Sequence, residues 1–140
     1  TPIAPTLARG TLAESHPATA TRPAMVVIEF PNTNYELHLV PAAAITTQPG
    51  KRIVGEIHVS ARRVDVVETG GKYVEPVIGR PRRVQGRVVA VDAATNTITV
   101  DAGMAVHLKL TDSRQQADQF PLGALVSCDV LDGATFTPRM

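Results

Sequence analysis

The sequence predicts a single all-β domain. Its 140 residues are enough for one domain with one core. Aromatic residues make up only 4% of the chain although 44% of it is hydrophobic, so Val, Ile, Leu and Ala must build that core. β-Branched residues favour strands, and 10 Gly and 11 Pro supply frequent turns. These observations favour short strands joined by turns over a helical fold.

Residues 1–24 are predicted to form an extended arm. The segment is rich in Pro, Ala and Thr and shows no hydrophobic periodicity, which is typical of disorder. Such an arm becomes ordered only where other residues hold it. We therefore expect it to lie along its own barrel or along a neighbouring subunit.

An N-terminal hairpin is predicted next. Residues 25–30 form an apolar run and residues 35–40 alternate between apolar and polar side chains. The turn-forming residues 31–34 lie between them and join the two strands. Residues 51–60 alternate in the same way and predict a further strand.

A second hairpin is predicted around Gly70 and Gly71. The strand-like segments 62–68 and 72–78 flank these glycines, which suit the positive φ angles of a tight hairpin turn. Pro76 has no N–H to donate, so its strand must lie at a sheet edge or end near that residue.

The last third of the chain has the clearest strand pattern. Gly86 lies in a strand with valines on both faces, which indicates a bend or a bulge. A short helix is expected near 112–119, with Asp112 and Gln115 placed as a capping box. Four strands surround this helix in the order strand, strand, strand, helix, strand, at residues 83–92, 97–100, 104–110 and 124–131.

This order resembles the core of an OB-fold over residues 82–137. The resemblance implies a small closed β-barrel of the kind that binds oligonucleotides, oligosaccharides or proteins. It is a resemblance of fold, which does not determine function. We therefore expect residues 25–140 to form one domain, a small OB-like β-barrel with the added N-terminal hairpin and the extended arm 1–24.

A weak internal similarity links residues 52–57 to residues 83–88. Both segments begin with Arg and place Gly at their fourth position. The similarity indicates either a duplicated strand unit or a coincidence of β patterning.

Positive charge is concentrated in the middle of the chain although the formal net charge is only +1. Residues 51–87 carry nine Lys or Arg against four acidic residues, whereas residues 88–140 carry three against six. The imbalance indicates an anion-binding stripe, or two complementary surfaces that meet within the domain or across an oligomer interface. The candidate residues for binding nucleic acid or another polyanion are Lys51, Arg52, Arg62, Arg63, Lys72, Arg80, Arg82, Arg83 and Arg87.

A protein that binds single-stranded nucleic acid also needs aromatic platforms on which bases stack. The basic segment contains only one aromatic residue, Tyr73. The face of an OB-like unit that usually binds ligand has none here, because its outward residues are Thr97, Thr99, Ala105, His107 and Lys109. Solvated strand faces whose charges discourage edge pairing therefore explain the basic residues better than nucleic-acid binding.

Three histidines, His38, His58 and His107, share one context, a predicted strand with an apolar residue on each side. Histidines on neighbouring strands can form a three-histidine zinc site. Strand alternation places each of them on the outer face, where Glu36 and Glu56 are expected to be solvated neighbours. No close spacing such as H-x-H or H-E-x-x-H occurs. We therefore expect no metal site and no cofactor.

No catalytic signature is present in the sequence. A G-x-S-x-G elbow is absent, and the paired glycines lie between strands rather than before a helix, as a phosphate loop requires. The sequence therefore predicts a non-enzymatic module for protein interaction or assembly that forms a homo-oligomer. The alternative is an OB-like nucleic-acid- or polyanion-binding protein that uses the basic segment 51–87.

The chain is expected to lie in the cytoplasm without membrane contact. It has no run of ~18 apolar residues and no visible signal peptide. Its single cysteine, Cys128, cannot form an intrachain disulfide, which is compatible with a reducing compartment. Cys128 lies between Val126 and Val130 on an apolar strand face, so we expect a small buried hydrophobe rather than a nucleophile.

Overall fold

The computed structural model describes residues 6–31 and 33–139. The regular structure of these residues is eleven strands and one three-residue 3-10 helix, which confirms the all-β prediction. No helix among them is long or apolar enough to cross a membrane. Residues 1–5 of the predicted arm and Asn32 of the predicted turn lie outside the described residues.

Five strands pair in a closed ring, which we call ring one. The predicted N-terminal hairpin is present, and its second strand pairs in parallel with the last strand of the chain. That strand and the first strand both pair antiparallel with a 15-residue strand, β4, which closes the ring. In ring order the members are β1 (Ala8–His16), β2 (Met25–Glu29), β3 (Glu36–Pro41), β11 (Thr135–Arg139) and β4 (Arg52–Val66).

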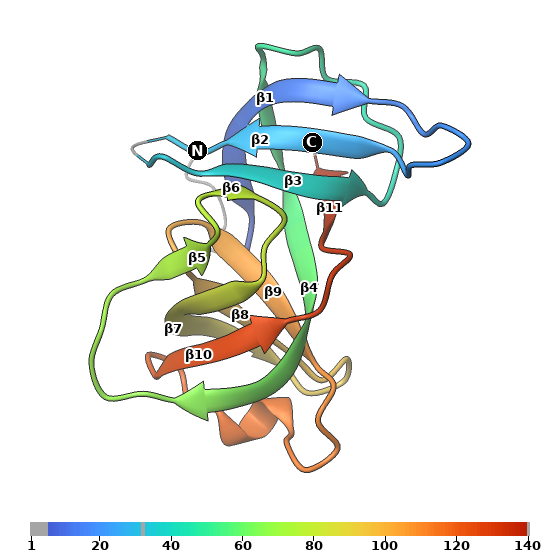
Figure 1. Ribbon diagram of the computed structural model, residues 1–140. Helices are drawn as coiled ribbons and strands as arrows, with labels where there is room; N and C mark the ends of the chain where they lie inside the picture. The colour runs from blue at the N-terminus through green and yellow to red at the C-terminus, as the bar shows by residue number, and fades with distance from the viewer. Residues whose placement is uncertain (1–5, 32, 140) are drawn as a thin grey trace.

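A second closed ring, ring two, shares β4 with the first. Its first three strands form an antiparallel meander, the third pairs in parallel with β4, and β4 pairs antiparallel with the fourth. The fourth strand then pairs antiparallel with the first. Figure 1 shows β4 running from one ring into the other. In ring order the other members are β7 (Arg83–Asp92), β8 (Thr97–Asp101), β9 (Ala105–Leu110) and β10 (Leu125–Val130).

The two rings repeat one design. In β1, Gly10 lies against the backbone of Glu29 in β2, and in β7 Gly86 lies against the backbone of Asp101 in β8. The β1–β2 register shifts just after Leu12, and the β7–β8 register shifts just after Val88. These glycines and bulges let each first strand bend around its ring, as predicted for Gly86. The strand β1 of ring one therefore corresponds to the strand β7 of ring two.

The sequence similarity between residues 52–57 and 83–88 does not follow this match. It aligns the start of β4 with β7, which occupy different positions in the two rings. β7 is the first strand of ring two, whereas β4 is the fourth strand of ring one in chain order. The similarity therefore does not mark equivalent strands. It reflects only that each strand has a closely packed glycine at its fourth position.

Part of the predicted arm is a strand. Residues 8–16 form β1, with Ala8, Gly10 and Leu12 buried and the residues between them more exposed. The arm thus lies along its own domain, which was one of the two expected positions. The sequence hid this strand because two of its three inward residues, Ala8 and Gly10, carry little or no side chain to reveal the alternation.

The predicted hairpin around Gly70 and Gly71 is wrong. Residues on its N-terminal side belong to the continuous strand β4, and β5 (Tyr73–Glu75) pairs with β7 instead. Only Gly70 has a positive φ, whereas the predicted turn needs two such residues. A two-residue β6 (Ile78–Gly79) then pairs with β3 of ring one. Pro76 directly follows β5, as predicted from its missing N–H.

The predicted helix near 112–119 is present but covers only η1 (Ala117–Gln119). Tertiary hydrogen bonds replace the missing helical turn. The side chain of Gln115 binds both the N–H and the C=O of Val64, at 2.8 and 2.6 Å. The N–H of Ala117 donates to the side chain of Asn96 at 2.8 Å. The capping box forms at Gln116 and not at Asp112.

Aliphatic side chains fill both rings, as the composition predicts. The largest fully buried side chains include Leu12, Ile28 and Phe136 in ring one and Ile98 and Leu108 in ring two. Cys128 of β10 is buried among them, and burial raises the pKa of its thiol to about 12. The thiol therefore stays protonated and packs as a small hydrophobe, as expected.

Candidate functional site

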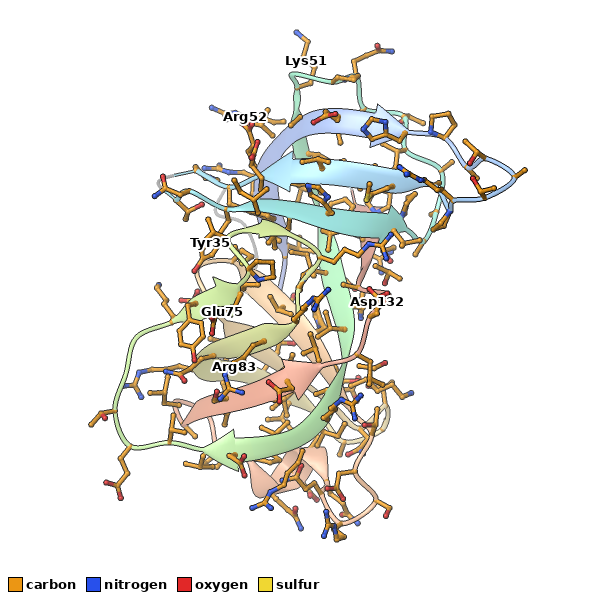
Figure 2. All side chains as sticks on the ribbon, viewed as in Figure 1. Tyr35, Lys51, Arg52, Glu75, Arg83 and Asp132 are labelled. Carbon is orange, nitrogen blue, oxygen red and sulfur yellow. The ribbon has the colours of Figure 1, made fainter. Side chains whose placement is uncertain are left out.

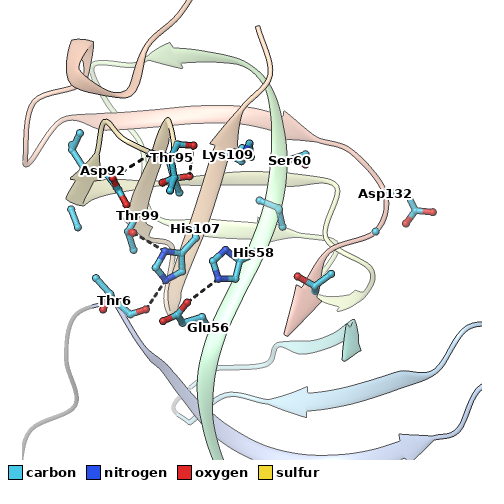
Figure 3. Close-up of a pocket in the computed structure, with 16 residues that line it drawn as sticks. Thr6, Glu56, His58, Ser60, Asp92, Thr95, Thr99, His107, Lys109 and Asp132 are labelled. Atoms are coloured by element: carbon cyan, nitrogen blue, oxygen red, sulfur yellow. Dashed lines mark hydrogen bonds and ion pairs between the residues drawn. The ribbon is translucent and has the colours of Figure 1, made fainter. Parts of the chain in front are cut away.

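A polar groove of about 600 Å³ lies over the outer faces of β4, β8 and β9 (Figure 3). The loop between β7 and β8 contributes to its lining, and so do residues that precede β11. Of the five outward residues predicted for the OB-like unit, four line it and Ala105 does not. The polar residues that line the groove are Thr6, Glu56, His58, Ser60, Asp92, Thr95, Thr97, Thr99, His107, Lys109, Asp132 and Thr135.

Two histidines stack at one end of this groove. His58 in β4 lies directly beside His107 in β9, because the two strands pair in parallel at this register. Their ring centroids are 4.6 Å apart and the planes are inclined by 20°. Thr99 continues the row on β8 and Thr135 continues it on β11. The sheet thus presents one row of polar side chains across four adjacent strands.

Glu56 orients the first of these histidines. Its carboxylate Oε1 lies 2.9 Å from Nε2 of His58, and Nε of Arg139 donates to Oε2 at 3.3 Å. Burial alone would raise the pKa of the Glu56 carboxyl, but these two partners hold it below its usual value. Glu56 is therefore a carboxylate near neutral pH.

His107 is held from both sides of its ring. Nε2 lies 2.7 Å from the carbonyl oxygen of Thr6, to which only an N–H can donate. Nδ1 then accepts a hydrogen bond from the hydroxyl of Thr99 at 3.0 Å. Burial lowers the pKa of His107, and the adjacent His58 lowers it further. His107 is therefore a neutral imidazole near pH 7.

These contacts bring three metal-ligating groups together. One ligand atom from each of Glu56, His58 and His107 lies within 4.8 Å of the others. Of the three candidate histidines, the structure unites His58 and His107 and leaves out His38, which lines a separate cavity beside β3. Sequence reasoning treated Glu56 only as a solvated neighbour. The sequence feature that indicates Glu56 is its position two residues before His58, on the same face of the strand.

Among the described residues, the one hydroxyl that is hydrogen-bonded to a histidine of this cluster is that of Thr99, which is buried. His58 is hydrogen-bonded to Glu56, but no described hydroxyl lies within hydrogen-bonding distance of its other nitrogen. His107 uses both nitrogens on Thr6 and Thr99.

The chain matches no protein-family model, no curated protein and no solved structure.

Three of the predicted basic residues pair with the acidic C-terminal segment. Lys72 binds Asp101 at 3.1 Å, Arg80 binds Asp132 at 3.2 Å and Arg83 binds Asp129 at 2.7 Å. These pairs join the two oppositely charged parts of the sequence within one chain. The complementary surfaces that the charge imbalance predicted therefore meet, for these residues, inside the domain.

Arg83 has the most contacts of the nine candidates. Beside Asp129, its guanidinium donates to the hydroxyls of Ser127 at 2.9 Å and Tyr73 at 3.4 Å. The hydrogen bonds with Tyr73 and Asp129 raise the pKa of Arg83. Tyr73, the one aromatic residue of the basic segment, is thereby tied to this network.

The remaining basic candidates do not converge on one surface. Arg63 binds Asp65 of the same strand at 2.9 Å, and Arg87 donates to the Gly123 carbonyl at 2.9 Å. Lys51 and Arg52 lie at the ring-one end, far from Arg83 (Figure 2). The other two candidates, Arg62 and Arg82, are exposed.

Proposed function

We propose that the protein is a non-enzymatic, OB-like interaction module that binds a partner protein, including a second copy of itself, through the groove over β4, β8 and β9. The observation that carries the proposal is the position of this groove. The pairing order of ring two resembles that of an OB-fold, with β4, which precedes β7 in the chain, in the place of the fifth strand. OB-folds bind their ligands on the second and third strands and the adjoining loops, and β8 and β9 are those strands here.

The side chains of the groove favour a protein partner over a nucleic acid. The carboxylates of Glu56, Asp92 and Asp132 line it together with Lys109. Arg139 and Arg80 pair with Glu56 and Asp132, which leaves Asp92 as the lining carboxylate without an ion pair among the described residues. Carboxylates repel the phosphates of a nucleic acid, whereas the neighbouring hydroxyls can bind the backbone and polar side chains of a protein. Aromatic side chains, on which bases would stack, are absent from the described lining.

A second copy of the chain offers matching charge. Lys51 and Arg52 are exposed at the ring-one end, and neither forms an ion pair among the described residues. Docking of this end into the groove of another copy, beside the unpaired carboxylate of Asp92, would join unlike surfaces head to tail. Such an assembly would weaken as salt screens the contact.

Light scattering after size-exclusion chromatography tests this proposal. We expect a defined oligomer at low salt that dissociates in the K51E/R52E double variant. The matched control is R22E, which reverses an exposed charge in the segment between β1 and β2. A monomer at every protein and salt concentration would contradict the proposal.

The same protein preparation tests the nucleic-acid alternative. Fluorescence anisotropy with labelled single-stranded DNA and RNA should show no binding even at low ionic strength. Salt-dependent binding that is lost in the variant with Arg82, Arg83 and Arg87 changed to Ala would favour the alternative instead. Deletion of residues 1–24 is not a useful test of assembly, because it removes β1 from ring one.

A further inference from the structure

We propose that Glu56, His58 and His107 bind a divalent transition-metal ion of the zinc class at one end of the groove. Two imidazole nitrogens and one carboxylate oxygen are a common ligand set for a zinc ion that keeps an open position. This inference goes beyond the interaction role and does not depend on it. Figure 3 shows the three side chains converging from the two neighbouring strands β4 and β9.

The distances among the ligand atoms require only a small adjustment. In the structure they lie within 4.8 Å of one another. Tetrahedral zinc with ligands at 2.0–2.2 Å would hold them about 3.4 Å apart. Rotation of side chains can close this difference, because the strands that carry them are already paired in the required register.

His58 is the side chain that moves. The stacked rings hold their nitrogen lone pairs in two nearly parallel planes, so one ring must turn before both can face a single ion. The side chain of His58 is 43% exposed and Glu56 is its one hydrogen-bond partner among the described residues. The 2.9 Å contact is a hydrogen bond in which Nε2–H of His58 donates to Oε1, so His58 must move this proton to Nδ1, or turn to present Nδ1, before it binds the ion.

His107 needs a change of tautomer to act as a ligand. Its Nδ1 faces the hydroxyl of Thr99. Thr99 is only 4% exposed, so the surrounding side chains hold this hydroxyl in place. When the metal binds Nε2, the ring proton moves to Nδ1 and is donated to the Thr99 oxygen. Metal-bound histidines require such an acceptor for the second nitrogen. The ring remains neutral throughout, and the Thr99 hydroxyl hydrogen turns away from Nδ1 so that its oxygen can accept the new N–H. The carbonyl oxygen of Thr6, 2.7 Å from Nε2, lies where the ion would bind and must move aside or itself become a ligand.

Glu56 supplies the negative charge that favours a cation. Arg139 binds Oε2 and thereby leaves Oε1 directed toward the histidines. Three protein ligands leave a fourth position of the ion open to the groove, where an oxygen or nitrogen atom of a bound partner could coordinate it. The proposed site would therefore lie in contact with the occupant of the groove.

Isothermal titration calorimetry of untagged, chelator-treated protein with ZnCl₂ tests this inference. We expect one equivalent of Zn²⁺ to bind, and Co²⁺ to give the visible absorption bands of a tetrahedral site. His58→Ala and His107→Ala should each weaken binding by more than about 100-fold, and Thr99→Val, which removes only the acceptor behind His107, by about 10-fold. Circular dichroism confirms that each variant folds.

The chain contains a matched control for this experiment. His16 in β1 lies 3.0 Å from Glu14, a histidine–glutamate pair with the same two-residue spacing. It has no third ligand nearby among the described residues. His16→Ala should leave the affinity for Zn²⁺ unchanged. No binding by the wild type, or full binding by folded His58→Ala protein, would overturn the inference. Because assembly is measured without metal, either result leaves the interaction proposal to its own test.

Discussion

Substitution of Gly86 by alanine should destabilise the protein more than any ordinary surface change. A Cβ at this position would lie 2.7 Å from the backbone carbonyl carbon of Asp101 and closer still to its oxygen. It would also lie 3.1 Å from the backbone nitrogen of Ala102. Real Cβ atoms essentially never approach a heavy atom within 3.0 Å, and backbone cannot rotate away as a side chain can. The β7–β8 pair must therefore separate locally.

The size of this effect follows from those contacts. Overpacking a well-packed position costs about 1–3 kcal/mol. Separation of β7 from β8 also weakens the ladder at Arg87 and Val88, and each lost hydrogen bond costs about 1 kcal/mol. We therefore expect Gly86→Ala to lower the free energy of unfolding by about 3 kcal/mol.

Urea denaturation followed by circular dichroism measures this change. The equivalent Gly10→Ala should also cost about 3 kcal/mol, because its Cβ would lie 2.5 Å from the backbone oxygen of Glu29 and 2.7 Å from Cγ2 of Ile28, a fully buried β-branched side chain that cannot turn away. Gly71→Ala is the matched control, since nothing lies within 4 Å of its Cβ position and its φ is not positive. The reasoning is refuted if Gly86→Ala and Gly71→Ala have the same midpoint.

Two further predictions concern a buried thiol and a half-buried amide side chain. Cys128, whose thiol has a pKa of about 12, should resist iodoacetamide in native protein at pH 8 and react readily in urea, as followed by mass spectrometry. Equal labelling rates in the two conditions would show that β10 opens freely. Gln115→Ala should lower the free energy of unfolding by about 2 kcal/mol, because it leaves the N–H and C=O of Val64 without their partner. An exposed change such as Gln48→Ala should leave the urea midpoint unaltered, and an equal effect of both would refute the role given to Gln115.

The candidate site could be predicted only in part from the sequence. Alternation correctly placed Thr97, Thr99, His107 and Lys109 on an outward face, and the structure shows that all four line the groove. The link between His58 and His107 could not be predicted. It depends on parallel pairing of β4 with β9, two strands far apart in the chain. Local patterns do not encode which distant strands become neighbours.

The fold, like the candidate site, could be predicted from the sequence only in part. Alternation and turn residues determined by themselves that the chain is all-β, that residues 25–40 form a hairpin and that the strand around Gly86 bends. Only the tertiary structure decided that β4 continues from one ring into the other and that residues 8–16 complete ring one. The physical reason is that side-chain alternation reports which face of a strand is buried. It does not report the partner to which the strand's N–H and C=O groups bind, and that choice is made when the whole chain packs.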